Sequence, residues 1–267
     1  MILFKKLNNI VGWTIFLIAS FVYLSTIEQT VSFWDCGEYI ATAYKLEVGH
    51  PPGAPLFQLF GRIFSLFATP GTSEVAIAIN TLSALCSSFT ILFLFWTITA
   101  FSKKIIIKNQ DINIEKTILI LSSGVIGSLA YTFSDSFWFS AVEGEVYAMS
   151  SLFTAATFWC IMKWEEESHK ASSGRWLVLI AYLIGLSIGV HLLSLLTIPA
   201  MGMIYYFKKY QYTKIGAIKA FFISIGLLGL VQGVIIPGAV SLISKFELFF
   251  VNSIGLPFNS GAIIYLI

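Results

Sequence analysis

Long apolar stretches recur along the chain, and they limit the possible folds more than any other feature of the sequence. A membrane helix needs roughly 20 mostly apolar residues, because each residue rises about 1.5 Å and the hydrocarbon core is about 30 Å thick. Hydrophobic residues make up 57% of the sequence and charged residues 11%, with a mean hydropathy of +0.84. This much apolar surface cannot be buried in one water-soluble core. The sequence therefore predicts an all-α polytopic membrane protein.

About seven stretches are long and apolar enough to be predicted as membrane spans. They are Ile10–Ile27, Val75–Phe101, Thr117–Phe133, Tyr147–Met162, Trp176–Val190, Leu192–Phe207 and Ala217–Ile236. The first lacks a small-residue cleavage pattern, so we interpret it as a retained signal anchor. Ala54–Phe67 is shorter and carries Arg62, which favours a short interfacial or re-entrant helix. We expect residues 1–267 to form a single transmembrane module at the N-terminal end of a longer protein.

Charge predicts the orientation of these spans. Lys and Arg accumulate in cytoplasmic loops. With a cytoplasmic N-terminus, only Lys45, Arg62 and Lys245 of the 16 basic residues lie on the outer side. The net charge of +2 reflects this asymmetry and forms no basic patch interleaved with aromatic residues, which excludes nucleic acid as a partner. The three cysteines show neither a disulfide framework nor metal-type spacing.

Acidic residues concentrate at the predicted outer ends of the spans. A carboxylate held at the membrane boundary usually lines a cavity or has a partner. Two outer segments hold most of these acids, WDCGEYIATAYKLEVGHPPGAP at residues 34–55 and SDSFWFSAVEGEVYAMSSLF at residues 134–153. In contrast, we interpret the run Glu165–Glu167 as a solvated cytoplasmic face.

The first acidic segment predicts an amphipathic outer-loop helix from Asp35 to about Val48. Its spacing places Tyr39, Ala43 and Leu46 on one face, and glycine and prolines end it. Asp35 followed three residues later by Glu38 matches a capping box, which is a structural role. The alternative is that Asp35 is a general base held in a fixed position near the membrane.

Histidines and glutamates elsewhere on the outer side also have two open interpretations. His50 either precedes a rigid polyproline-like exit into a helix that begins at Pro55, or contacts a phosphate. Glu143 and Glu145 either stabilise a helix N-terminus or share a cavity with Asp35. His191, at the turn in GLSIGVHLLSLL, is either a helix-end group or a cavity residue. Carboxylates can bind a divalent cation, but no DxD or EF-hand spacing is present and no metal is predicted.

The pattern D-x-G-E followed by L-x-V-x-H-P-P-G-x-P-L-F, from Asp35 to Phe57, resembles a bacterial membrane family. That family is related to the transmembrane protein O-mannosyltransferases, of the kind grouped in glycosyltransferase family 117. The segments EVYAMSSLF and GLSIGVH fit the same family, and the resemblance runs to about Tyr210. It implies a GT-C-like helical bundle that transfers a mannose-like sugar from a polyprenyl-phosphate donor to a protein hydroxyl. It also implies a location in the bacterial inner membrane, with the active site on the periplasmic side.

The resemblance also implies roles for individual residues. Asp35 is the likeliest catalytic base with Glu38 beside it, and His50 lies near the donor phosphate. Glu143, Glu145, Tyr147 and His191 contribute to the substrate pocket. Outer basic residues are scarce, so Arg62 is the best candidate for stabilising the leaving phosphate. The implied partners are a lipid-linked sugar donor, an acceptor protein and membrane lipid, without a cofactor.

Two other classes of protein remain open. A transporter or channel typically has ionisable residues or paired Gly/Pro breaks near the middle of its spans, whereas this sequence places its acids at span ends. We interpret the glycine pairs Gly124/Gly127 and Gly185/Gly189 as sites of close helix packing. A non-enzymatic membrane subunit, whose outer loops bind a partner, is also consistent with the spacing.

Overall fold

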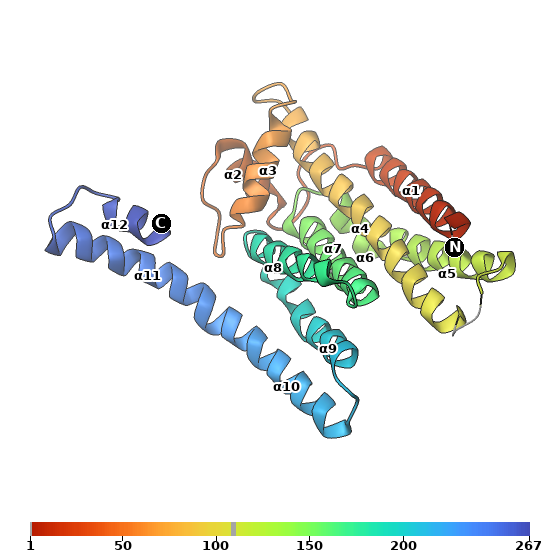
Figure 1. Cartoon of the computed structure of the whole chain (residues 1–267). Helices are drawn as coiled ribbons and strands as arrows, with labels where there is room; N and C mark the ends of the chain where they lie inside the picture. Colours follow the sequence, from red (N-terminus) through yellow and green to blue (C-terminus); the bar gives the residue numbers. More distant parts are fainter. Residues whose placement is uncertain (1, 108–110) are drawn as a thin grey trace. The chain divides into compact units, whose positions relative to one another are not determined.

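Helices account for nearly all of the regular structure, as the apolar pattern predicts. A computed structural model describes residues 2–107 and 111–267, and no β-strand occurs within these ranges (Figure 1). The chain divides into two compact units, Met1–Thr197 and Ile198–Ile267. That the two form a single transmembrane module stays a prediction. Lys108, one of the basic residues assigned to the cytoplasmic side, lies outside the described residues.

The first unit contains eight α-helices and two 3₁₀ turns in its described residues. They are α1 (Ile2–Ser25), α2 (Cys36–Lys45), α3 (Pro55–Ser65), α4 (Glu74–Ile107), α5 (Ile114–Thr132), α6 (Asp135–Val142), α7 (Val146–Glu167), η1 (Ala171–Ser173), α8 (Gly174–Ile188) and η2 (Leu192–Leu196). The long helix α4 packs against α1, α5 and α7 (Figure 1). It is therefore the element around which the first unit is built.

The second unit continues the apolar character of the first. Its elements are α9 (Thr197–Lys209), α10 (Lys214–Leu230), η3 (Val231–Ile235), α11 (Ile236–Leu248), η4 (Phe249–Ser253) and α12 (Ser260–Leu266). The π-helical segments η3 and η4 join α10 and α11 into one helical stretch from Lys214 to Ser253. The predicted span thus extends well beyond Ile236. A π-turn before Pro237 accommodates a residue that has no backbone N–H.

Within the described residues, five helical stretches are long and apolar enough to cross a membrane. They are Leu3–Ser25, Glu74–Ile107, Ile114–Thr132, Ala171–Ile188 and Lys214–Ser253. The predicted span Tyr147–Met162 corresponds to α7 and Leu192–Phe207 to η2 with α9, and neither is among these five. Leu192–Phe207 is not one helix, because Pro199 would clash with the carbonyl group of Leu195 and can be accepted only in the first turn of α9. The total of seven spans therefore stays a prediction.

Close helix packing explains three of the four glycines singled out in the sequence. A Cβ atom at Gly124 would lie 2.6 Å from Thr99 Cγ2, one at Gly127 would lie 2.7 Å from Ile98 Cδ1, and one at Gly189 would lie 3.2 Å from Leu56 Cβ. Gly124 and Gly127 therefore set the close approach of α5 to α4. The interpretation is wrong for Gly185, where a Cβ atom would meet nothing within 4 Å.

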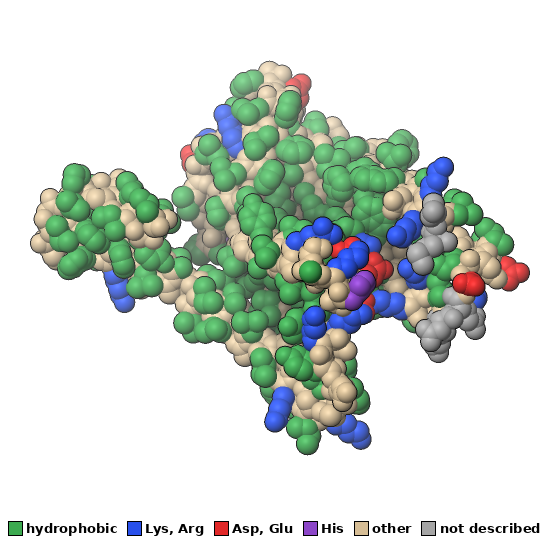
Figure 2. Space-filling view, in the orientation of Figure 1, with side chains coloured by type: hydrophobic (Ala, Val, Ile, Leu, Met, Phe, Trp, Pro, Cys, Tyr) green, Lys and Arg blue, Asp and Glu red, His purple; other side chains and the backbone are tan. Residues whose placement is uncertain are grey.

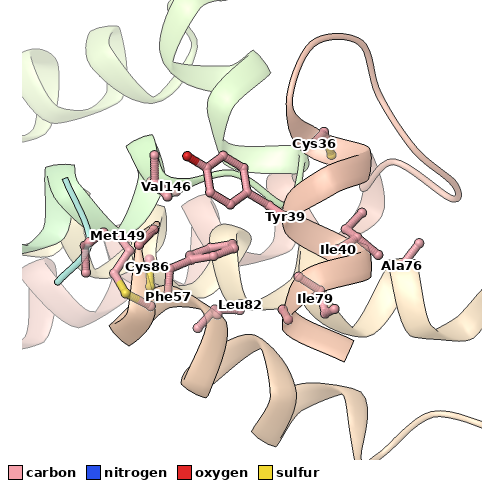
Figure 3. Close-up of a cluster of buried hydrophobic side chains, with 14 of the residues drawn as sticks. Cys36, Tyr39, Ile40, Phe57, Ala76, Ile79, Leu82, Cys86, Val146 and Met149 are labelled. Carbon is pink, nitrogen blue, oxygen red and sulfur yellow. The ribbon is translucent and has the colours of Figure 1, made fainter. Parts of the chain in front are cut away.

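The short helices α2 and α3 are held against the ends of the long helices by a buried apolar cluster. Its residues are Cys36, Tyr39, Ile40, Ala43, Ala54, Phe57, Val75, Ala76, Ile79, Leu82, Cys86, Val146, Ala148, Met149 and Val190 (Figure 3). A second cluster, around Tyr23 and Phe95, joins α1, α4 and α6. Because α4 and α7 are long and packed together, they give α2 and α3 a fixed platform.

The short helices differ from the prediction at their ends. The helix predicted to reach Val48 stops at Lys45, because Leu46 adopts a left-handed conformation with φ 55°. Leu46 is 55% exposed and does not share the buried face of Tyr39 and Ala43. In contrast, α3 begins at Pro55 as predicted and is only 11 residues long.

Candidate active site

Glu38 and His50 form the most closely bonded part of the outer segment. The backbone N–H group of His50 donates to Glu38 Oε1 at 2.6 Å, and His50 Nδ1 lies 3.0 Å from Glu38 Oε2. A Cβ atom at Gly49 would lie 3.1 Å from Glu38 Oε1, so glycine allows the loop to approach the carboxylate. The two hydrogen bonds with His50 lower the pKa of Glu38. The bond between the two side chains also raises the pKa of His50. A positively charged imidazole is therefore favoured here.

Asp35 lies on the other side of the same imidazole. Its Oδ2 atom is 3.8 Å from His50 Nε2, and its side chain is 55% exposed. Asp35 is the N-cap residue of α2 but makes no capping hydrogen bond with its side chain. The capping-box interpretation is therefore wrong. The backbone of Asp35 is in the αR region rather than the extended conformation that side-chain capping uses, and Glu38 reaches forward to His50 instead.

Glu145 adds a third carboxyl group from a distant part of the chain. It is the N-cap residue of α7, only 6% exposed, and it makes no capping bond. Burial, and then the charges of Glu143 and Asp35, raise the pKa of Glu145 to about 7. The charge of His50 acts in the opposite direction. We call Asp35, Glu38, His50 and Glu145 the carboxylate–histidine cluster.

Tyr39 lies at the centre of this cluster, although the sequence indicated only that it belongs to an apolar face. Its ring is buried beside Phe57, with 5.6 Å between the ring centroids (Figure 3). The His50 ring lies 5.7 Å from it between centroids. Burial, followed by the charge of Glu145, raises the pKa of Tyr39 to about 12. Its spacing of four residues from Asp35, which places the two on one face of a helix, was the available signal that it belongs to the same site.

Tyr147 and His191 extend the site onto α7 and the turn after α8. Their rings lie 5.3 Å apart between centroids. The N–H group of Leu56 donates to the carbonyl oxygen of Gly189 at 2.7 Å, which ties α3 to this turn. His191 Nδ1 accepts from the N–H group of Leu193 at 3.1 Å, and burial lowers the pKa of His191. His191 is thus both the N-cap of η2 and a neighbour of Tyr147.

Glu143 and Arg62 lie beside the carboxylate–histidine cluster, and the only direct bond from either to it is between Glu143 and Glu145, where the N–H group of Glu145 donates to the carbonyl oxygen of Glu143 at 2.9 Å, among the described residues. Glu143 is 5% exposed, and its Oε2 atom has no hydrogen-bond partner in residues 2–107 and 111–267. Burial raises its pKa, opposed by a hydrogen bond with Ser32. The guanidinium group of Arg62 donates to the carbonyl oxygen of Tyr44 at 2.8 Å, and its carbon atom lies 5.3 Å from the centre of the Tyr44 ring.

The cluster also has the donor set of a metal site. One ligand atom from each of Asp35, Glu38 and His50 lies within 4.8 Å of the others. Two carboxylates and an imidazole are ligands that divalent transition metals accept. Both oxygens of Glu38 are already used by His50, so a metal ion would have to replace these bonds. That no metal is needed stays a prediction.

The comparison with known families covers every candidate site residue. Residues 35–214 match the family described as the N-terminal domain of protein O-mannosyl-transferase TMEM260. The chain belongs to this family. The match begins at Asp35 and includes both outer segments, His191 and α9.

Two curated proteins that the chain resembles are also named as protein O-mannosyl-transferases. The chain is 28% identical over 195 residues to a protein O-mannosyl-transferase tmem260 of Dictyostelium discoideum, covering 69% of this chain and 22% of that protein. It is 25% identical over 168 residues to a protein O-mannosyl-transferase TMEM260 of Mus musculus, covering 62% of this chain and 21% of that protein. The chain therefore spans about a fifth of the length of these relatives. No solved structure matches the chain.

Proposed function

We propose that this chain is the membrane-embedded catalytic part of a glycosyltransferase that modifies protein hydroxyl groups. The donor is a mannose-like sugar linked through phosphate to a polyprenyl lipid, and the acceptor is a serine or threonine hydroxyl. The active site faces the non-cytoplasmic side, which is the periplasm if the protein lies in a bacterial inner membrane. Membership of the TMEM260 family supports the reaction class. The fold class proposed for it is GT-C.

The observation that carries the proposal is the unequal bonding of the two acidic residues on either side of His50. Both oxygens of Glu38 accept bonds from His50, whereas Asp35 is half exposed and has one oxygen 3.8 Å from His50 Nε2. A general base needs a carboxylate that is fixed in place but open to the hydroxyl group it deprotonates. We therefore assign the base to Asp35, and to Glu38 the role of positioning His50.

The reaction needs only a proton transfer and a stabilised leaving group. Asp35 takes the proton of the acceptor hydroxyl while the oxygen of that hydroxyl forms a bond to the anomeric carbon of the sugar. The bond between that carbon and the phosphate oxygen breaks, and the lipid phosphate leaves with the electron pair. His50, whose pKa is raised by Glu38, provides a positive charge beside Asp35 for this phosphate. Arg62 can assist if it releases Tyr44.

Glu145, Tyr147 and His191 complete the proposed substrate pocket. A Glu145 carboxyl group with a pKa of about 7 is partly neutral at physiological pH, so it repels an anionic donor less than an ordinary glutamate would. Tyr147 is 44% exposed and its ring lies against that of His191 at an angle of 58°, which gives the pocket an aromatic wall for a sugar or an isoprenoid chain. Glu143 supports the loop that carries Glu145.

The test is sugar transfer by the purified full-length protein in detergent. It is incubated with polyprenyl-phosphate mannose and an acceptor protein, and sugar incorporation is measured by mass spectrometry. We expect Asp35→Asn to lose nearly all activity, by a factor of at least about 10². Glu47→Gln is the matched control, because Glu47 is an exposed acid of the same segment, 4.0 Å from Lys45.

The outcome separates the proposal from its rivals. Loss of transfer in Asp35→Asn but not in Glu47→Gln supports Asp35 as the base. Equal activity in wild type and Asp35→Asn contradicts that assignment. A folded wild-type protein that transfers no sugar from any polyprenyl-phosphate donor favours a non-enzymatic subunit or a transporter.

A further inference from the structure

A second site lies at the other end of the helices that support the candidate active site. An open cavity of about 840 Å³ is lined by α1, the C-terminal parts of α4 and α7, and the loop that follows α7. Its lining residues are Phe4, Lys5, Asn8, Asn9, Trp13, Trp96, Thr99, Ala100, Lys103, Trp159, Met162, Lys163, Glu166, Glu167, His169 and Lys170. None of these belongs to the carboxylate–histidine cluster.

The length of α4 places this cavity at the opposite membrane face. Near the start of α4, Ser83 donates to the carbonyl oxygen of Glu145 at 3.5 Å, so this end of the helix adjoins the candidate active site. Lys103 lies near the other end of the same helix. At about 1.5 Å per residue the two are roughly 30 Å apart, which is about the thickness of the hydrocarbon core.

The cavity is lined by more positive than negative charge. Lys5, Lys103, Lys163 and Lys170 face it, together with Glu166 and Glu167. Charged side chains gather around this end of α7 on a surface that is otherwise largely hydrophobic (Figure 2). An anion entering the cavity is therefore attracted rather than repelled.

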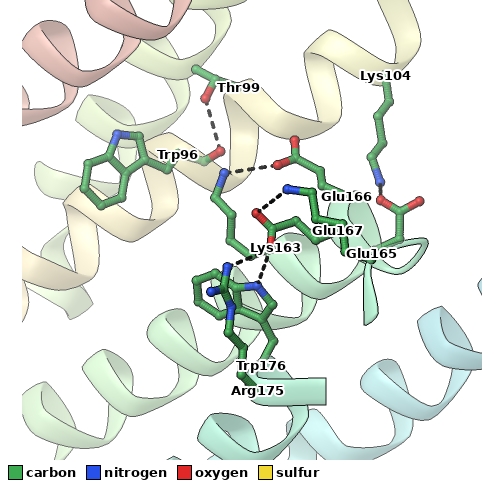
Figure 4. Close-up of polar contacts among 10 residues, drawn as sticks. Trp96, Thr99, Lys104, Lys163, Glu165, Glu166, Glu167, Arg175 and Trp176 are labelled. Carbon is green, nitrogen blue, oxygen red and sulfur yellow. Dashed lines mark hydrogen bonds and ion pairs between the residues drawn. The ribbon is translucent and has the colours of Figure 1, made fainter. Parts of the chain in front are cut away.

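Both acidic residues of the lining are already paired with cations. Glu166 lies 3.1 Å from Lys163, and Glu167 lies 3.3 Å from Lys170 and 3.0 Å from Arg175 (Figure 4). Hydrogen bonds, first from the Trp176 indole and then from Lys170 and Arg175, lower the pKa of Glu167 to about 2. These acids are thus ion-paired, which the interpretation of a solvated face did not include; that the face is solvated and cytoplasmic stays a prediction.

Two lysines of the cavity remain available to an anion. Lys5 and Lys103 form no ion pair with a carboxylate within the described part of the chain. Lys103 is held over the Phe4 ring with its Nζ atom 5.9 Å from the ring centre. The two basic groups come from α1 and α4, so a bound anion would join the ends of these helices.

Polar atoms without partners occur in the same lining. Trp96 Nε1 and Asn8 Oδ1 are buried and have no hydrogen-bond partner in residues 2–107 and 111–267. Trp96 Nε1 lies against α1, because a Cβ atom at Gly12 would be only 2.7 Å from it. Since both atoms are closed off, neither can bond to a ligand without a rearrangement. Trp96 also lies between Trp13 and Trp159, with ring centroids 6.2 Å and 5.7 Å away. These rings give the cavity an apolar wall beside its basic rim.

We propose that this cavity binds the headgroup of an anionic phospholipid. The phosphate lies between Lys5 and Lys103, and the part of an acyl chain nearest the headgroup lies along the tryptophan rings. An anionic phosphodiester matches the two ammonium groups that form no ion pair with a carboxylate. A lipid is favoured over a soluble phosphate because tryptophan rings line the cavity at a membrane face, where they adjoin both headgroups and hydrocarbon. The α1 residues of the site precede the family match at Asp35, so the proposal does not follow from membership of the TMEM260 family.

The test is lipid binding to the full-length protein, stripped of lipid in detergent and examined by native mass spectrometry. Phosphatidylglycerol is titrated against phosphatidylcholine, which has the same phosphate but no net charge. We expect wild type to prefer phosphatidylglycerol and Lys5→Gln/Lys103→Gln to lose at least about tenfold in its affinity for that lipid. Lys214→Gln/Lys219→Gln is the matched control, because it removes the same charge from α10 and leaves the cavity lining intact.

A second variant keeps the test decisive if the double lysine variant does not fold. Lys5→Gln alone removes one of the two ammonium groups from an exposed position near the start of α1, and we expect a loss of about threefold in phosphatidylglycerol affinity. Equal binding of the two lipids, or unchanged phosphatidylglycerol binding in both cavity variants, overturns the proposal. Displacement of the lipid by excess glycerol 3-phosphate also overturns it, because the ligand would then be a soluble phosphate compound.

Discussion

At the scale of single residues, the two acids of the D-x-G-E motif have different surroundings and so different expected roles. Glu38 accepts two bonds from His50, one from the backbone and one involving the ring. Asp35 has only a longer approach to the same ring. Because the motif shows both acids at adjacent turns of one helix, sequence alone left open which of them is the base.

The first prediction concerns Glu38. Glutamine at this position has no charge and only one acceptor oxygen, so Glu38→Gln cannot accept from both the backbone N–H group and a protonated Nδ1 atom of His50. We expect transfer to fall about tenfold, much less than in Asp35→Asn. Glu38 raises the pKa of His50, so its loss lowers that pKa and the imidazolium is lost at lower pH. Initial rates measured against pH should show the alkaline limb shifted to lower pH. A wild-type rate and profile in Glu38→Gln would contradict the positioning role.

The second prediction concerns the pH dependence of stability through Glu145. Its pKa in the folded protein is raised from an ordinary value to about 7, so the folded state binds the proton more tightly than the unfolded state. The contribution of Glu145 to the free energy of unfolding is then fully present below about pH 4.5, and it is lost as the pH rises to about 7. A shift of this size corresponds to about 3 kcal/mol.

Glu145→Gln replaces the titrating carboxyl group with a neutral amide, so the decline in stability between about pH 4.5 and 7 should become smaller. We expect the midpoint of thermal unfolding in detergent at pH 8 to rise by roughly 5 °C relative to wild type, and to change little at pH 5. Glu47→Gln, on an exposed side chain, is the control and should follow wild type at both values. Parallel pH curves for wild type and Glu145→Gln would show that this carboxyl group does not carry the effect.

At the scale of helices, the packing of α5 against α4 depends on a glycine with no room for a side chain. The third prediction is that Gly124→Ala destabilises the protein by about 1–2 kcal/mol, despite the better helix propensity of alanine. Its Cβ atom would lie 2.6 Å from Thr99 and 2.8 Å from Phe95, which are themselves buried and cannot move away. Gly185→Ala, with open space around it, should be neutral or stabilising. Thermal unfolding of the two variants in detergent tests this, and equal midpoints would show that the close contact is not limiting.

The same scale shows which features of the fold the sequence predicts and which it does not. Apolar runs of about 20 residues correctly predicted α1, α4, α5 and α8. A helix that crosses a bilayer must be both long enough and apolar enough, so its sequence is easy to recognise. Pro55 correctly marked the start of α3. An apolar run alone, in contrast, does not show where a helix is interrupted. Pro199 divides Leu192–Phe207 into η2 and α9.

The site was only partly predictable for a related reason. Acid and histidine positions at span ends predicted that the outer residues gather, and His50 does lie between Asp35 and Glu38. The central place of Tyr39 was not predicted, because a helical period gives the face of a residue but not what packs against that face. The bonds of Arg62 to Tyr44 depend in the same way on how α2 and α3 meet.

At the scale of the whole first unit, the carboxylate–histidine cluster and the lysine-lined cavity lie at opposite ends of α4. The fourth prediction follows from this separation: single cysteines placed at the two ends are labelled from opposite sides of the membrane. Glu47→Cys replaces an exposed residue of the outer segment, and Lys170→Cys replaces a residue at the cavity. The three native cysteines are buried, so they contribute little background.

In intact cells, a membrane-impermeant maleimide should label Glu47→Cys and leave Lys170→Cys unlabelled until the membrane is permeabilised. Detergent should expose both, which controls for a cysteine that is simply unreactive. Labelling of Lys170→Cys alone in intact cells would reverse the predicted orientation and place Asp35 on the cytoplasmic side, which contradicts the proposed non-cytoplasmic active site. Equal labelling of both in intact cells would mean that α4 does not cross the bilayer between them, and the two sites would then share one face.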